Sequence, residues 1–207
     1  MIALLNIATA GDLCWASPPD HDAIQRGADV AKTCSPFHQR NGAGRPEDAM
    51  PRIAGQSAIY LASQLTLFAD GTRNNGVMRM FARNLNEQTR QDVAAYYASQ
   101  SPSAAPTSAS LKDSWILARG KLLARVGDES KQLQACDNCH GPDGSGELYA
   151  IPYLAGQSGA YLSNALREFQ RKDRSSPLMG PVAARLGDDD VIAVASYFES
   201  MAGDRDE

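Results

Sequence analysis

The sequence predicts an all-α fold built from two tandem domains that are related by an internal duplication. The segment MPRIAGQSAIYLASQLTLF at 50–68 recurs as IPYLAGQSGAYLSNALREF at 151–169, an offset of 101 positions. Apolar residues recur at helical spacing in both copies, and no stretch alternates cleanly enough to indicate a sheet. A repeat of about 100 residues is too long for one unit of a solenoid, so the copies are two separate domains.

Each copy contains a central helix and a final helix. Ser57 is expected to cap the first central helix, and Gly71 is expected to end it. Ser158 opens the counterpart in the second copy. The final helices are expected in NEQTRQDVAAYYASQ and, in the second copy, after the acidic run Asp188–Asp190. Acidic residues suit a helix N-terminus, so we expect these aspartates to cap the helix and otherwise to face solvent, with a docking patch as the alternative.

The chain divides into four segments. Residues 1–16 are interpreted as a secretory leader, although they lack the usual positive start; a disordered leader or a short first helix is the alternative. Domain 1 is expected at 17–100 and domain 2 at 111–207. Between them, 101–110 reads SPSAAPTSAS, a run without charge that suits an exposed linker.

Composition excludes two broad functions. The formal net charge is −4, and no basic stripe is present, which argues against nucleic-acid binding. No apolar run approaches the ~20 residues that a membrane-spanning helix needs.

The motif CDNCH at 136–140 is the pattern of covalent attachment of haem c. Cys136 and Cys139 would form thioethers with the two haem vinyl groups, and His140 would ligate the iron. A zinc site would need four ligands, and a second cysteine pair or paired histidines are absent from the sequence. A redox pair would need a strand–helix context, and a disulfide would leave the histidine unexplained.

A second iron ligand is expected later in each domain. Met179 follows the turn-like SSPL, and Met78 occupies the same register in domain 1. Met80 aligns with Pro181, so we expect it to pack rather than to ligate. His/Met ligation raises the reduction potential of a haem and fills both axial positions, which favours electron transfer over catalysis.

Domain 1 departs from the motif at one position. Its sequence CSPFH at 34–38 retains Cys34 and His38, but Phe37 stands where a second cysteine is expected. Three interpretations remain open. A haem is retained through Cys34 alone, with His38 and Met78 as ligands; the domain is empty or only partly loaded; or the sequence carries an error or an engineered change.

The motifs CDNCHGPDGSG, YLAGQSGAYL, SSPLMGPVAARL and DDDVIAVASYF resemble those of the dihaem cytochromes c4, tandem class I cytochromes c of bacterial periplasms. The resemblance covers about residues 22–201. It implies two tandem cytochrome c-like domains packed about a pseudo-twofold axis, with haem c as cofactor. It also implies an electron carrier, not an enzyme, that works in the periplasm and shuttles single electrons between respiratory redox partners.

The implied partners are a terminal oxidase, a membrane cytochrome complex or a dehydrogenase, and peripheral membrane association and homodimer formation are left open. One alternative is a cytochrome subunit of a flavin-linked dehydrogenase complex. Another is an enzyme with an open iron site in domain 1, which requires that Met78 does not bind. Two further pairs recur in both copies, Arg73 with Arg174 and Gln56 with Gln157. These pairs are expected to contact haem propionates or the domain interface, with helix-end packing as the alternative.

Overall fold

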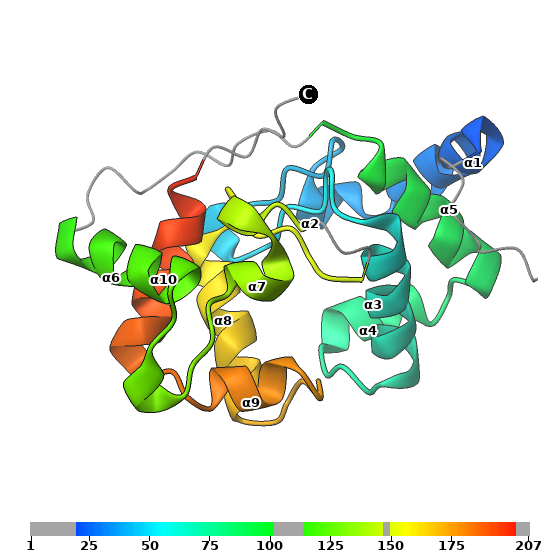
Figure 1. Ribbon diagram of the computed structural model, residues 1–207. Helices are drawn as coiled ribbons and strands as arrows, with labels where there is room; N and C mark the ends of the chain where they lie inside the picture. The colour runs from blue at the N-terminus through cyan, green and yellow to red at the C-terminus, as the bar shows by residue number, and fades with distance from the viewer. Residues whose placement is uncertain (1–19, 102–113, 147–149, 202–207) are drawn as a thin grey trace, which may run out of the picture.

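The computed structural model describes residues 20–101, 114–146 and 150–201, and every regular element within these ranges is helical (Figure 1). The α-helices are α1 (His21–Ala31), α2 (Ser35–His38), α3 (Ala58–Asp70), α4 (Gly76–Ala82), α5 (Glu87–Ala98), α6 (Ser114–Arg125), α7 (Asp137–His140), α8 (Gly159–Gln170), α9 (Met179–Ala183) and α10 (Asp188–Glu199). The described ranges also contain the 3₁₀ turns η1 (Pro46–Asp48), η3 (Glu129–Lys131) and η4 (Pro142–Gly144). The predicted all-α class is therefore confirmed. Among the described helices, none combines the length and apolar character that crossing a membrane would require.

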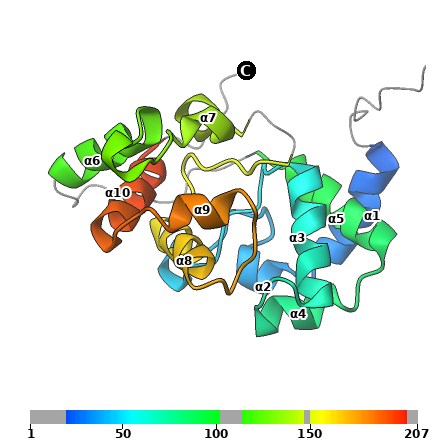
Figure 2. The ribbon, with the colours of Figure 1, turned by 60° about the horizontal axis from the view of Figure 1, so that its bottom comes forward.

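The duplication appears as two sets of helices in the same order, α1–α5 and α6–α10, which we call the first and second lobes. In each lobe the first helix packs along the last, α1 on α5 and α6 on α10. The third helix of each lobe contacts the fourth and the fifth. Figures 1 and 2 show the lobes side by side. The expected leader and nearly all of the expected linker lie outside the described residues, so the domain boundaries stay predictions.

The helix ends follow from local sequence. The hydroxyl of Ser57 accepts a hydrogen bond from the backbone N–H of Tyr60 at 3.3 Å, and that of Ser158 caps α8 in the same way. Gly71 ends α3 in a left-handed conformation with φ of 88°, which glycine adopts without steric cost. These three sequence predictions are confirmed.

Apolar cores lie where the last helix of each lobe meets its neighbours. The larger core is in the second lobe, where Leu123 of α6 and Val191 and Phe198 of α10 are almost fully buried. In the first lobe the corresponding cluster joins Ala31 of α1 to Val93 and Tyr97 of α5.

The first and last helices of each lobe cross at a glycine. A Cβ added to Gly27 would lie 2.1 Å from the carbonyl oxygen of Asp92, and one added to Gly120 would lie 2.1 Å from that of Ala193. Both distances are far below van der Waals contact, so only glycine allows the two backbones to approach this closely. In both lobes, a glycine at the crossing thus sets the distance between the first and last helices. The packing of each core depends on that distance.

Substitution Gly120→Ala should therefore destabilise the protein by about 2–3 kcal/mol, because overpacking here meets backbone rather than a flexible side chain. Urea unfolding of the haem-loaded protein measures the effect. Gly76→Ala is the control, since an added Cβ there meets no atom within 4 Å, and it should be neutral or stabilising by up to about 1 kcal/mol. Equal stability of the two variants would contradict the close crossing.

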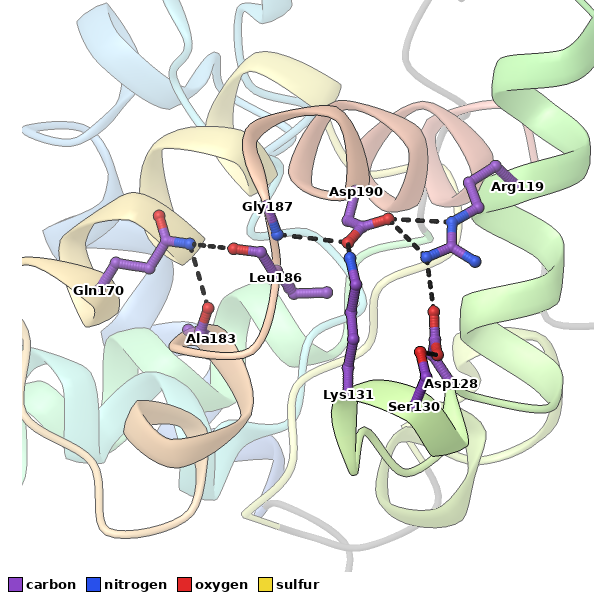
Figure 3. A network of polar contacts seen from close by, with 9 residues as sticks. All are labelled: Arg119, Asp128, Ser130, Lys131, Gln170, Ala183, Leu186, Gly187 and Asp190. Atoms are coloured by element: carbon purple, nitrogen blue, oxygen red, sulfur yellow. Dashed lines mark hydrogen bonds and ion pairs between the residues drawn. The ribbon is translucent and has the colours of Figure 1, made fainter.

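A network of charged side chains ties α6 and η3 to the start of α10 (Figure 3). Asp190 accepts hydrogen bonds from Arg119 at 2.9 Å, from Lys131, and from the backbone N–H of Gly187 at 3.2 Å. Arg119 also pairs with Asp128 at 2.8 Å. The expectation that the aspartates of this run only cap the helix and face solvent is thus wrong for Asp190, which is buried.

The other two aspartates of the run, Asp188 and Asp189, are exposed as expected. Figure 3 shows a second polar contact nearby, in which the side-chain amide of Gln170 donates to the carbonyls of Ala183 and Leu186. This contact ties the end of α8 to the turn that follows α9.

The protein should become less stable at acidic pH, because the carboxylates of this network become protonated. Hydrogen bonds from Ser130 and Arg119 lower the pKa of Asp128 from 3.8 to about 2. Burial favours protonation of Asp190, but hydrogen bonds from Lys131 and Arg119 lower its pKa overall. Because these pKa values are depressed in the folded state, the stabilisation is complete above about pH 3.8 and is lost as the pH falls towards about 2. Unfolding free energies measured across this window should show a shallower fall for Asp128→Asn than for the parent.

The matched control for the acid experiment is Asp188→Asn, which changes an exposed carboxylate on α10, the helix of Asp190. Its pH profile should follow that of the parent. If Asp128→Asn and Asp188→Asn gave the same profile, the network would not carry the acid sensitivity.

Two glutamines join the lobes reciprocally. The Gln56 side chain accepts a hydrogen bond from the backbone N–H of Tyr153 at 2.9 Å and donates to the carbonyl of the same residue at 3.1 Å. Gln157 makes the equivalent pair of hydrogen bonds to the backbone of Arg52, both at 2.9 Å. Gln56 matches Gln157 and Arg52 matches Tyr153 in the duplication, so the four hydrogen bonds are related by a pseudo-twofold axis.

Two arginines form a second reciprocal pair. Arg73 and Arg174 meet at an isolated antiparallel bridge between the lobes. The guanidinium of Arg174 donates to the hydroxyl of Tyr60 at 2.9 Å, and that of Arg73 donates to Tyr161 at 3.3 Å. Of the roles expected for the two recurring pairs, the structure therefore favours the domain interface over simple helix-end packing.

Candidate haem sites

His140 in the second lobe is prepared for iron ligation. It ends the short helix α7, and only 7% of its surface is exposed. Its Nδ1 lies 2.9 Å from the carbonyl oxygen of Pro152. A carbonyl can only accept, so Nδ1 carries the proton and Nε2 keeps a lone pair for a metal. Burial lowers the pKa of His140, which favours the neutral imidazole that ligation requires.

His38 in the first lobe has the same arrangement. It ends α2, is 8% exposed, and its Nδ1 lies 3.0 Å from the carbonyl oxygen of Pro51. Burial lowers the pKa of His38 as well. The lobe that lacks the second cysteine therefore keeps the contact that fixes the histidine tautomer.

The cysteines of both motifs form no disulfide. Cys34, Cys136 and Cys139 are half-buried. Burial raises the pKa of Cys136 to about 12 and also raises that of Cys34, which disfavours the thiolate that zinc binds. Within the described ranges, no group of three or more His, Cys, Asp or Glu side chains converges as ligands of a bare metal ion do. The donors thus fit covalent haem attachment better than a zinc site.

A glycine in each lobe lets the loop after the histidine rest on the last helix. Gly42 and Gly144 have φ of 77° and 71°, and a Cβ at either position would lie within 3.0 Å of an aromatic ring. These rings are Tyr97 on α5 and Phe198 on α10. The loop that follows the histidine therefore packs directly on the last helix in each lobe.

The two candidate methionines lie on the fourth helix of their lobes. The backbone N–H of Met78 in α4 donates to the side chain of Asn75 at 2.9 Å, and that of Met179 donates to Ser176 at 3.0 Å. Both methionine side chains are half-buried. Met80 is 58% exposed, so the packing role expected for it is wrong: it lies on the solvent side of a short helix.

In the first lobe the structure brings the two ligand segments together. Phe37, directly before His38 in α2, contacts Phe81 in α4 with ring centroids 5.4 Å apart and planes at 65°. Sequence reasoning identified Phe37 as a departure from the motif but missed Phe81. The signal was present, because Phe81 aligns with the smaller Val182 in the duplication.

The relatives that match most of this chain include an electron acceptor and cytochromes c4. A thiosulfate dehydrogenase electron acceptor from Thiomonas intermedia is 38% identical, with 97% of this chain and 92% of the relative covered. A cytochrome c4 from Pseudomonas aeruginosa is 32% identical, with 84% of this chain and 87% of the relative covered. A scan against protein-family models found no match.

Solved structures with the same fold include a cytochrome c4 and a thiosulfate dehydrogenase. The reduced recombinant cytochrome c4 from Pseudomonas stutzeri has a TM-score of 0.77 at 29% identity, with 86% of this chain and 98% of that chain covered. A thiosulfate dehydrogenase from Marichromatium purpuratum in its as-isolated form has a TM-score of 0.76 at 32% identity. The match to it covers 86% of this chain and 40% of that longer chain.

The duplicated helical fold, the buried histidines and these matches define a c-type cytochrome, an electron carrier rather than an enzyme, whose cofactor is haem c. More specifically, the chain belongs to the dihaem cytochrome c4 family. The sequence-based expectations of fold, carrier function and cofactor are confirmed. The assignment of individual residues is not tested by the matches and stays a prediction.

Proposed function

We propose that the second lobe holds a haem attached through Cys136 and Cys139, with His140 and Met179 as its iron ligands. The observation that carries this proposal is the Nδ1 contact of His140 with the Pro152 carbonyl, which leaves Nε2 available in a buried position. Holding the other ring nitrogen through a carbonyl is how proteins orient and strengthen a ligating histidine.

The first lobe is proposed to hold a second haem, attached through Cys34 alone and ligated by His38 and Met78. The support is the repetition of the same histidine contact and the same burial in both lobes. A lobe without haem would have no use for a buried, tautomer-locked histidine. The competing interpretation is an empty first lobe.

A bound haem supplies one-electron exchange between the ferrous and ferric states of its iron. The residues of the chain fix which chemistry is open to that iron. A histidine and a methionine in each lobe would ligate that iron and leave no position open for a substrate. The reciprocal contacts of Gln56 and Gln157 hold the lobes in one orientation, so electrons would pass between two centres at a constant separation.

The proposed donor is a thiosulfate-oxidising dehydrogenase in the periplasm. The observation that favours it is the electron-acceptor relative, whose match covers almost the whole chain. A respiratory oxidase or membrane cytochrome complex would then receive the electrons. Reduction of the purified cytochrome by thiosulfate should require a thiosulfate dehydrogenase. If thiosulfate dehydrogenase did not reduce the cytochrome and another dehydrogenase did, the proposed donor would be wrong.

The haem assignment is tested by intact mass under denaturing conditions, together with the alkaline pyridine spectrum. Two haem additions are expected, and the spectrum should combine the signatures of one-thioether and two-thioether haem. A single haem addition would leave the second lobe as the only loaded one and would support the empty-lobe interpretation.

A further inference from the structure

The phenylalanines of this chain show an asymmetry between the lobes. The sequence contains five, and three of them have an aromatic counterpart in the duplication: Phe68 matches Phe169, and Phe198 matches Tyr97. The other two, Phe37 and Phe81, match Cys139 and Val182. The two phenylalanines that exist only in the first lobe are the two that contact one another.

Their contact joins the two sides of the proposed first haem site. Phe37 directly precedes His38, and Phe81 lies one helical turn after Met78 in α4. Both rings are half-buried and meet edge to face, the geometry that aromatic pairs prefer. The pair therefore connects the segment of one expected iron ligand to the segment of the other.

The position of Phe37 in the motif would place its ring beside a vinyl group of the first haem. In a complete motif the cysteine at this position bonds a haem vinyl group, as proposed for Cys139 in the second lobe. Phenylalanine has no nucleophile, so the corresponding vinyl group of the first haem would stay an unreacted, apolar alkene. An aromatic ring at this position is suited to pack against such a group, and Phe81 is suited to hold the ring in place.

We propose that Phe37 and Phe81 form an aromatic latch that takes over the holding role of the missing second thioether in the first lobe. The proposal rests on the proposed attachment of the first haem through Cys34. In the first lobe the latch packs α2 against α4; in the second lobe the proposed thioether of Cys139 would hold the haem at the equivalent position. The latch forms no bond and transfers no electron, so its effect falls on how firmly Met78 stays on the iron.

The test uses the haem-loaded protein and the variant Phe81→Val, which installs the residue of the second lobe. The ferric protein is mixed with imidazole, and replacement of methionine on the iron is followed through the loss of the methionine–iron charge-transfer band. The phase that belongs to the first lobe should become about fivefold faster, the scale expected for loss of an aromatic pair. An unchanged rate would overturn the latch.

The control repeats Phe81→Val in a Phe37→Cys background. Phe37→Cys completes the motif and should convert the pyridine spectrum to the two-thioether form for both haems. Once a second thioether holds the first haem, Phe81→Val should have little effect on the exchange rate, because the latch has been replaced by a bond. An equal effect in both backgrounds would show that Phe81 only fills space, and would overturn the proposal.

Intact mass distinguishes failure of the latch from failure of the proposed attachment of the first haem. Two haems with an unaffected exchange rate would overturn the latch and leave the attachment through Cys34 standing. One haem in the parent protein would overturn the first-lobe assignment and the latch with it.

Discussion

Replacing Cys34 by alanine should reduce the covalently bound haem of the purified protein from two per chain to one. Cys34 is the only sulfur in the first motif, since Phe37 occupies the second position and cannot form a thioether. Its half-buried sulfur lies four residues before the buried His38. Without that thiol, His38 and Met78 would hold the first haem by coordination alone, and denaturation would release it.

The measurement is intact mass after denaturation, which retains only covalently attached haem. Cys139→Ala is the matched control in the second lobe, because it creates the same one-cysteine arrangement with Cys136. That variant should keep two haems, and its alkaline pyridine spectrum should report one-thioether haem in both lobes. A Cys34→Ala protein with the same haem mass as the parent would contradict attachment through Cys34.

Much of the fold was accessible from sequence because its determinants are local or repeated. The caps at Ser57 and Ser158 depend on residues three positions apart, and the left-handed end at Gly71 needs only a missing Cβ. The candidate iron ligands were found because the duplication places His38 and Met78 opposite a complete motif. A local motif and the constant offset of the duplication are enough to identify such candidate ligands.

What sequence reasoning missed depends on distant contacts. Asp190 looked like one of three equivalent surface acids until the structure placed it between Arg119 and Lys131 from another part of the lobe. Met80 was expected to pack because it aligns with Pro181 and not with Met179, but the short α4 turns it towards solvent. In both cases the outcome depends on which helix face meets a neighbour, and spacing along the chain does not determine that for a short helix or a helix end.

The lobe interface shows the same limit. The sequence showed that Gln56 and Gln157 recur, but it left haem propionates, the interface and helix-end packing as alternatives. The structure places each glutamine against the backbone of the opposite lobe, about 100 positions away in the chain. The recurrence of a residue indicates a role in both copies. Its hydrogen-bond partner becomes visible only when the two copies are placed relative to one another.

Replacing both interface glutamines by leucine should uncouple the two lobes. Each glutamine makes two hydrogen bonds to a buried backbone segment, and leucine can make neither. Loss of hydrogen bonds to buried groups costs about 1–3 kcal/mol each, so each single variant should lose about 2–6 kcal/mol of stability. The pseudo-twofold symmetry predicts similar losses for Gln56→Leu and Gln157→Leu.

Urea unfolding of the haem-loaded protein, followed by helix content and by haem absorbance, checks this prediction. The parent should unfold in one transition, and the double variant should unfold in two, because the hydrogen bonds that make the lobes one cooperative unit are gone. Gln91→Leu, on the exposed face of α5, makes the same change of side chain away from the interface and should leave a single transition. If the double variant also kept one transition, the arginine–tyrosine pairs alone would suffice to couple the lobes. With two transitions, electron exchange between the two haems should slow as well, because the glutamines would then be what keeps the two centres at a fixed separation.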